Sequence, residues 1–286
     1  MFIGTDKLTY TYMPGTPFAS DALKNISFSL GRGSFTLLIG PSGSGKTTLI
    51  QHLNGLLKPT SGKVYFDGKS IGSDKSALLS LRRRIGLVFQ MPEDQFFSET
   101  VFNEIAYAPR NLGLAENKIE ERVFKAVEQV GLRPENLLDR HPFHLSTGQK
   151  RLVAFAAVLS IEPEVLILDE PAAGLDPAGK LMLFNLLSRL NRIEQITILV
   201  STHHLDEVAE LADNLVVLTG GRLEMAGKAR DILARRSELQ DLGLALPQVT
   251  EIIDELAARG LPVCTDIYSL SAACNEIIRL KRVDQS

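Results

Sequence analysis

A glycine-rich segment that ends in a lysine and a threonine has the residue types that bind nucleotide phosphates. Residues 40–47 read Gly-Pro-Ser-Gly-Ser-Gly-Lys-Thr and match the spacing G-x-x-x-x-G-K-[ST], between an apolar run and a stretch with helical spacing. Backbone N–H groups of such a turn donate to phosphate oxygens, and the helix that follows adds the positive end of its dipole. Lys46 would reach the outer phosphates, and Thr47 would offer its hydroxyl to Mg²⁺. The segment therefore predicts a phosphate-binding loop.

Two adjacent carboxylates, Asp169 and Glu170, follow the apolar run of residues 165–168. Beside a phosphate-binding loop, Asp169 would hold Mg²⁺ directly or through water. Glu170 would polarise the attacking water, a role that needs a carboxylate the metal does not neutralise. An acidic pair is a weak signal by itself, because the first turns of helices also favour Asp and Glu. Together with the loop, the pair indicates hydrolysis of a nucleoside triphosphate.

A second segment, Leu-Ser-Thr-Gly-Gln at residues 145–149, opens an amphipathic stretch upstream of Asp169. In one interpretation Ser146 is the N-cap of a helix, a frequent role for serine. In the other, the N-terminus of this helix binds the phosphate of a nucleotide held elsewhere, because the chain already has a phosphate-binding loop of its own. The residues alone leave both interpretations open.

These groups need buried strands and helices to position them. Apolar runs predict strands near residues 23–30, 35–39, 63–66, 85–89, 165–168, 196–200 and 215–218. Helical spacing predicts helices from about residue 45, over most of 98–160, and near 177–192, 205–212 and 249–259, with a short end after them. The pattern predicts an α/β fold, a P-loop NTPase core with a helical insertion. We expect a nucleotide-binding domain at residues 1–234, with its helical subdomain at about 98–160, and a small C-terminal domain at 235–286.

Composition excludes several other classes of protein. The chain has 286 residues, 44% hydrophobic and 23% charged, so it can bury a full core and is not intrinsically disordered. Its net charge of -3, without a block of like charge, argues against nucleic acid as a partner. The N-terminus does not read as a signal peptide, and the longest apolar run, residues 152–161, is too short to span a membrane. Cys264 and Cys274 have no ligand-spaced partners, which fits a reducing cytosol and predicts two buried thiols.

The ordered set of motifs resembles the ATP-binding subunit of ABC transporters. The resemblance covers residues 1–234, and the segments that carry it are residues 40–47, 145–149, 166–170, 174–176 and 202–203. It implies an ATPase in which two chains sandwich ATP and Mg²⁺. The phosphate-binding loop of each chain would face the signature segment of the other, which in this chain is residues 145–149.

The resemblance also implies a role for each matching residue. Tyr12 would stack on adenine, and the loop residues in contact with ATP would be Gly40, Pro41, Ser42, Gly43, Ser44, Gly45, Lys46, Thr47 and Thr48. The partner's ATP would contact the signature residues Ser146, Thr147, Gly148 and Gln149. The residues that act in hydrolysis would be Glu170, His203 and Gln90. The metal ligands would be Thr47, Gln90 and Asp169, and Asp176 would cross the dimer interface.

Two of these assignments have alternatives or departures. Tyr12 could be an ordinary strand aromatic, and Tyr10 or Phe18 could compete with it for adenine. Thr147 stands where the family has a glycine, which places a β-branched side chain beside the phosphate-binding turn. A helical φ is open to threonine, so we expect a small effect on hydrolysis.

Within the ABC family, residues 12–18 and 91–101 resemble the ATPase subunits of energy-coupling-factor importers, and in particular the second of two paralogues. Such importers take up vitamins or transition-metal ions. The implied partners are a second ATPase, with a heterodimer favoured over a homodimer, a transmembrane coupling subunit and a substrate-binding membrane subunit. The chain would lie peripherally at the cytoplasmic face of the membrane. Glu93 and Asp94 would either face basic coupling segments or belong to a solvated acidic loop.

Two other functions remain as alternatives. A soluble ABC ATPase of translation or DNA repair would show tandem cassettes, a long coiled coil or basic arms, and this sequence has one cassette and none of those features. A hydrolysis-poor nucleotide sensor is the other, and the presence of Glu170 and His203 argues against it.

Overall fold

The computed structural model describes residues 2–72, 74–203, 205 and 209–283, and it contains two sheets. The larger sheet has the strand order β10-β9-β3-β8-β7-β6, in which β9 and β10 pair antiparallel and the other neighbours pair parallel. Every residue of β3 and β7 is buried, because both faces of the sheet are covered. The strands of this sheet are β3 (Phe35–Ile39), β6 (Ile85–Val88), β7 (Val165–Asp169), β8 (Thr197–Thr202), β9 (Asn214–Thr219) and β10 (Arg222–Lys228).

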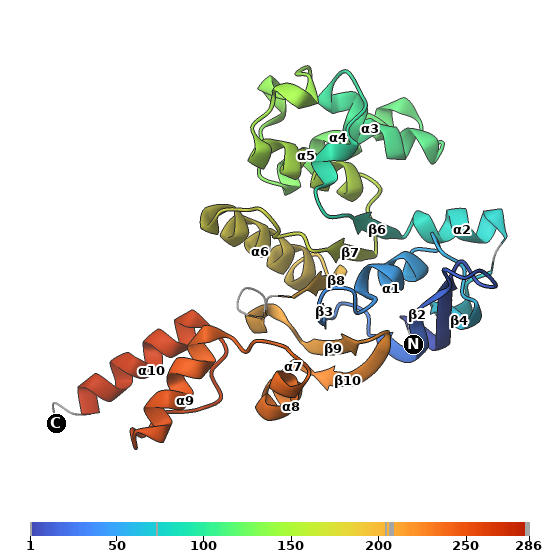
Figure 1. Ribbon diagram of the computed structural model, residues 1–286. Helices are drawn as coiled ribbons and strands as arrows, with labels where there is room; N and C mark the ends of the chain where they lie inside the picture. The colour runs from blue at the N-terminus through green and yellow to red at the C-terminus, as the bar shows by residue number, and fades with distance from the viewer. Residues whose placement is uncertain (1, 73, 204, 206–208, 284–286) are drawn as a thin grey trace.

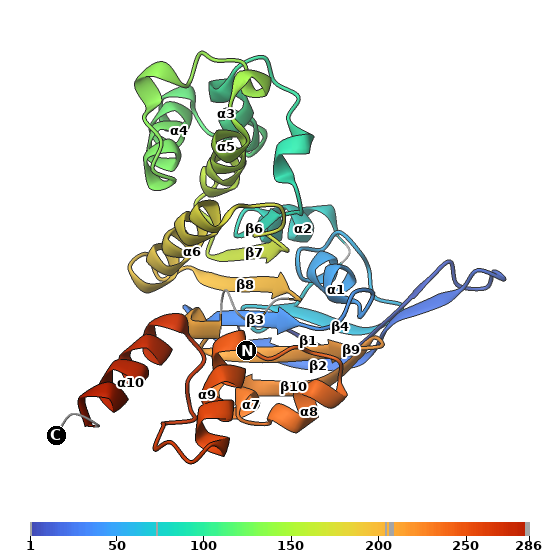
Figure 2. The ribbon, with the colours of Figure 1, turned by 60° about the vertical axis from the view of Figure 1, so that its left-hand side comes forward.

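The smaller sheet is antiparallel and has the order β2-β1-β4-β5. Its strands are β1 (Ile3–Tyr12), β2 (Ser20–Leu30), β4 (Ser61–Phe66) and β5 (Lys69–Ser70). Helix α1 (Lys46–Leu53) packs against both sheets, and its buried Leu49, Ile50 and Leu53 belong to the same apolar cluster as strand residues from each (Figure 2). The loop that leads into α1 is therefore held from two sides.

A group of helices is inserted between β6 and β7 and stands apart from the sheets, in green in Figure 1. It contains α3 (Val101–Asn111), α4 (Glu116–Gln129) and α5 (Thr147–Leu159). The predicted helical insertion and the α/β class are confirmed. The connecting helices and single turns are α2 (Lys75–Arg82), α6 (Pro177–Arg192), η1 (Pro92–Gln95), η2 (Pro134–Asn136), η3 (Pro142–His144) and η4 (Ala209–Leu211). Among the described residues, no helix has the length and hydropathy needed to cross a bilayer.

The C-terminal helices lie at the opposite end of the molecule from α3, α4 and α5 (Figure 2). They are α7 (Ala229–Leu233), α8 (Arg236–Asp241), α9 (Gln248–Ala258) and α10 (Leu270–Val283). Leu239 and Leu244 join the main core, whereas Ile253, Ile267 and Ala273 form a small cluster of their own. The division of the chain at residue 234 stays a prediction.

Two expectations about this end of the chain are wrong. The sequence predicted a short end after residue 259, but α10 forms there, because Ala273, Ile277 and Leu280 recur at helical spacing. Cys264 and Cys274 are exposed free thiols and not buried ones, since the small cluster of α9 and α10 does not enclose them. The helix predicted at 205–212 includes residues 206–208, which lie outside the described residues.

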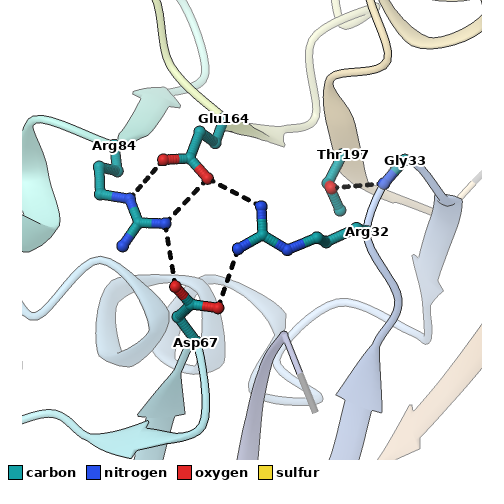
Figure 3. Close-up of polar contacts among 6 residues, drawn as sticks. All are labelled: Arg32, Gly33, Asp67, Arg84, Glu164 and Thr197. Carbon is teal, nitrogen blue, oxygen red and sulfur yellow. Dashed lines mark hydrogen bonds and ion pairs between the residues drawn. The ribbon is translucent and has the colours of Figure 1, made fainter.

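Four charged side chains join the two sheets at the amino-terminal ends of the parallel strands (Figure 3). Arg32 precedes β3, Arg84 precedes β6, Glu164 precedes β7, and Asp67 lies in the turn between β4 and β5. Arg32 donates to Asp67 at 2.8 Å and to Glu164 at 3.2 Å. Arg84 holds both oxygens of Glu164, one of them at 2.9 Å, and contacts Asp67 at 3.3 Å. This network ties together turns that are far apart in the sequence.

The network makes stability depend on pH. The hydrogen bond from Arg84 lowers the pKa of Glu164 below its usual value of 4.5, so the ionised form stabilises the fold above that pH and the stabilisation is lost as pH falls. We expect Glu164→Gln to lower the melting temperature by about 2 °C at pH 7, and the difference from the parent to shrink as the pH falls below 4.5. Thermal unfolding followed by circular dichroism across this range measures it. Glu116→Gln, in an exposed pair with Arg110, is the control. A melting-temperature difference between Glu164→Gln and the parent that did not change with pH would contradict a stabilising role for the ionised Glu164 carboxylate.

Candidate functional site

The predicted phosphate-binding loop leaves the carboxyl end of β3 and runs into α1. Gly43 and Gly45 have φ angles of 75° and 101°, in the left-handed region that favours glycine. A Cβ at Gly45 would also lie 2.7 Å from the carbonyl oxygen of Ala22. Glycine at these positions allows the tight turn that precedes the N-terminus of α1, the place where such loops bind phosphate.

Lys46 is a buried cation at the start of α1. Its Nζ donates to the carbonyl oxygens of Gly40 at 2.8 Å and Pro41 at 3.2 Å, and lies 3.9 Å from a carboxylate oxygen of Glu170. Burial lowers the pKa of Lys46, and the charges of Glu170 and Asp169 oppose that shift. Negatively charged phosphate oxygens at this position would act on Lys46 as these two carboxylates do and would favour its ammonium form.

The carboxylate of Asp169 lies between two hydroxyl groups at the end of β7. Thr47 Oγ1, on α1, donates to Asp169 Oδ2 at 2.6 Å. Ser201 Oγ, on β8, donates to Asp169 Oδ1 through a short hydrogen bond. The parallel register of β7 and β8 pairs Asp169 with Ser201 directly. Both carboxylate oxygens are thereby oriented from neighbouring elements.

Glu170, the next residue, has a backbone conformation that non-glycine residues rarely adopt. Its φ is 51°, and its N–H donates to Ser201, at 3.1 Å to Oγ and 3.2 Å to the carbonyl oxygen. Its Oε2 lies 2.7 Å from His203 Nδ1, which comes from the end of β8. Strained conformations of this kind concentrate at functional sites because the surrounding contacts must hold them.

The phosphate-binding loop, Glu170 and His203 border one groove of about 570 Å³ at the carboxyl ends of the parallel strands, whereas the buried Asp169 and Ser201 do not line it. Tyr12 lies in it, with its hydroxyl 3.1 Å from Thr48 Oγ1 and its ring edge-on to Tyr10. Phe18 is 78% exposed and Tyr10 also packs on His52, so Tyr12 is the aromatic that lines the groove. The lining residues are Tyr12, Ser20, Asp21, Ala22, Ser42, Gly43, Ser44, Gly45, Lys46, Thr47, Thr48, Gln90, Glu170 and His203.

The predicted signature segment is not among the residues that line this groove. Ser146 is the N-cap of α5, and it forms a reciprocal capping box with Gln149. Thr147 is the first residue of the helix, and a Cβ at Gly148 would meet nothing within 4 Å. Asp176 is likewise an N-cap, since its Oδ1 accepts from Gly179 N at 2.7 Å. Both segments are ordered by local hydrogen bonds, and their outer sides are exposed.

Comparison with known proteins identifies the family. The family described as "ABC transporter" matches residues 23–173. The energy-coupling factor transporter ATP-binding protein EcfA2 of Caldanaerobacter subterraneus subsp. tengcongensis is 45% identical over 99% of this chain and 98% of its own length. The chain belongs to the ABC transporter ATP-binding family. Its relative in Clostridioides difficile, also named EcfA2, is 46% identical over 99% of this chain and 98% of its own.

Solved structures of ABC proteins share the fold of this ABC ATPase. The structure of cbiO1 from Clostridium perfringens, described as part of the ABC transporter complex cbiONQ, is 38% identical with a TM-score of 0.75 and covers 88% of this chain and 98% of its own. A dimeric ATP-binding cassette in a post-hydrolysis state with ADP and Pi is 28% identical with a TM-score of 0.71 and covers 80% of this chain and 99% of its own. These relatives confirm an ATP-binding ATPase and do not favour the translation or DNA-repair alternative.

One residue of this ABC site was missed from the sequence. Ser201 is fully buried, donates to Asp169 and accepts from the N–H of Glu170. The sequence feature that could have identified Ser201 is its position two residues before His203, on a strand that pairs with β7. That pairing is known only once the strand order is known.

We expect Ser201→Ala to lower the rate of ATP hydrolysis about tenfold, because it removes the hydrogen bonds that orient two carboxylate-bearing residues. The measurement is kcat for ATP in the purified complex. Ser160→Ala is the matched control, since Ser160 is also a buried serine but bonds only to carbonyls of the helical insertion among the described contacts. Equal rates for the two variants would contradict a role for Ser201.

Proposed function

We propose that the chain is the ATP-hydrolysing subunit of an energy-coupling-factor importer and works as one of two cassettes that close on ATP. The observation that carries the proposal is the groove in which the phosphate-binding loop, Glu170 and His203 meet without the signature segment. A groove whose lining, among the described residues, includes no part of the signature segment fits a site that another chain closes.

In this proposal the loop and Lys46 bind the ATP phosphates and stabilise the negative charge that develops on them. Glu170 accepts a proton from the water that attacks the γ-phosphorus, while the bond to the bridging oxygen breaks to give ADP and phosphate. His203 supports this role because its hydrogen bond orients the Glu170 carboxylate. Tyr12 would stack on adenine at the outer end of the groove, and Gln90 would contact the phosphate end.

The residues that would hold Mg²⁺ fit a small hard cation. Thr47 and Asp169 offer a hydroxyl and a carboxylate 2.6 Å apart, and Gln90 lines the groove together with Thr47. Oxygen ligands of this kind, few in number, are the ones Mg²⁺ takes beside nucleotide phosphates. When bound, the ion neutralises charge on the phosphate oxygens. We propose these three residues as its protein ligands.

The second cassette would supply the missing face. In the proposal Ser146, Thr147, Gly148 and Gln149 contact the partner's ATP, and Asp176 lies at the interface between the two chains. We favour a heterodimer, because residues 12–18 resemble the second of the two related ATPases of such importers.

The membrane subunits would dock beside the segment after Gln90. Met91, Phe97 and Tyr107 expose apolar surface there, and the last two rings pack edge to face at 4.6 Å. Asp94 is exposed, as expected, but Glu93 is buried and cannot face a basic coupling segment, because it pairs with Arg151. In this proposal the chain lies peripherally at the cytoplasmic face of the membrane.

The transported solute would be a vitamin or a transition-metal ion bound by a separate membrane subunit. Mass spectrometry of the complex purified from its own membrane tests the assembly. Co-purification of a second ATPase with both membrane subunits would support the proposal. Recovery of the chain without any membrane protein would contradict it.

Glu170→Gln should keep ATP binding and lower turnover at the site of this chain by about 100-fold or more, because the amide keeps the shape of the side chain but is a poor proton acceptor. ATP binding, ATPase rate and ATP-dependent dimerisation in the intact complex measure it, and the closed dimer should become more stable. Glu164→Gln, the same change at the opposite ends of the strands, is the control. Parent turnover by Glu170→Gln would show that another group is the base.

Thr147→Gly should change hydrolysis little, because Thr147 already sits in the first turn of α5 and the Ser146 cap remains. The site that this signature completes holds the partner's ATP. The ATPase rate is therefore measured in a complex in which Glu170→Gln, in this chain, silences the site that holds this chain's own ATP. Purification through two different tags excludes homodimers. A several-fold gain in rate would mean that the threonine slows the partner's site.

A further inference from the structure

Arg151 is a buried charge one turn into α5, next to the signature segment, and the mechanism above does not use it. Its side chain is 7% exposed and that of its partner Glu93 is 9% exposed. Nε and Nη2 of Arg151 donate to the two oxygens of Glu93 at 3.3 and 3.0 Å. Glu93 lies in η1, three residues after Gln90. This planar pair therefore joins the signature helix to the segment after Gln90.

The third nitrogen of Arg151 contacts the turn that follows Glu170. Nη1 donates to the carbonyl oxygens of Pro171 at 3.2 Å and Ala173 at 2.9 Å. Ala173 N in turn donates to the carbonyl oxygen of Glu170 at 3.1 Å. Glu170, whose backbone is in the left-handed region, thus leads directly into a turn whose carbonyl oxygens accept hydrogen bonds from Arg151.

The turn that Arg151 contacts borders a cavity. Residues 170–174 border a cavity of about 240 Å³, lined on its other side by Lys180, Phe184, Val200, Thr202 and His203. A segment beside such a space can move more readily than one enclosed by close-packed side chains. The hydrogen bonds from Arg151 act on the turn in addition to its own backbone bonds.

We propose that Arg151 is a positioning residue for ATP hydrolysis, which holds the turn of residues 171–173 and through it the backbone of Glu170. Glu93 fixes the orientation of the Arg151 guanidinium. A displacement of η1 would therefore shift Arg151 and, through the turn that it contacts, the backbone of Glu170. The rate of hydrolysis should respond to this contact more than ATP binding does, because Lys46 and the phosphate-binding loop belong to other elements. The inference rests on the proposed role of Glu170.

The test is a double variant, Glu93→Leu with Arg151→Met, in the intact transporter complex. Apolar side chains can replace a buried ion pair with little loss of stability, but they cannot donate to Pro171 and Ala173. We expect a melting temperature close to that of the parent, a KM for ATP within about twofold, and a kcat about tenfold lower. A parent kcat would overturn the inference, and so would a parallel loss of kcat and ATP affinity, which marks a structural role only.

Arg151→Lys provides the same test if the double variant does not assemble into the complex. It keeps the charge, but one ammonium group cannot hold both oxygens of Glu93 and both carbonyls, so kcat should fall at unchanged KM. Arg84→Lys, in the bidentate pair with Glu164, is the control and should turn over like the parent. Glu170→Gln is assayed beside them. Loss of turnover in Glu170→Gln, with parent turnover in the Arg151 variants, would overturn the inference about Arg151. Parent turnover in Glu170→Gln would instead contradict the proposed role of Glu170.

Discussion

The Asp169 carboxylate, held by the hydroxyls of Thr47 and Ser201, is the contact on which the geometry of the site depends. It joins α1, β7 and β8 at one point, and Ser201 also accepts from the N–H of Glu170. The direction of Glu170 therefore depends on the register of two neighbouring strands. Parallel strands bring their carboxyl ends to one edge of the sheet, so a loop after β3, a carboxylate after β7 and a histidine after β8 meet although they are far apart in the sequence.

A second feature is that the signature segment of this chain does not line its groove. The phosphate-binding loop, Glu170 and His203 line the groove, while the signature segment begins a helix in the inserted helical unit. The ion pair of Arg151 with Glu93 links that helix to the segment after Gln90 and to the turn after Glu170. Hydrogen bonds of Arg151 thus connect the helical insertion with the turn beside the groove within the chain. Opposite this edge, the network of Arg32, Arg84, Asp67 and Glu164 holds the amino-terminal ends of the strands (Figure 3).

Local features were predictable from the sequence, and contacts across strands were not. The phosphate-binding loop and the pair Asp169 and Glu170 follow from short spacings next to apolar runs, so they were found together with the α/β class. Ser201 and the partner of Glu93 depend on register and helix packing, which no spacing along the chain reveals. Strand β10 was not predicted because only Met225 in it is buried, and Cys274 was misjudged because its helix packs through a small cluster. The roles of the signature and of Asp176 remain predictions, since they concern a second chain.

In the proposed dimer, the phosphate-binding loop of this chain and its signature segment serve different nucleotides. Vanadate trapping with a photoreactive ATP analogue, in a complex whose two ATPase chains separate on a gel, measures which chain holds the trapped nucleotide. Lys46→Ala should remove the label from this chain, whereas Ser146→Arg should remove it from the partner and leave this chain labelled. Loss of this chain's own label in Ser146→Arg, with the partner still labelled, would contradict that prediction.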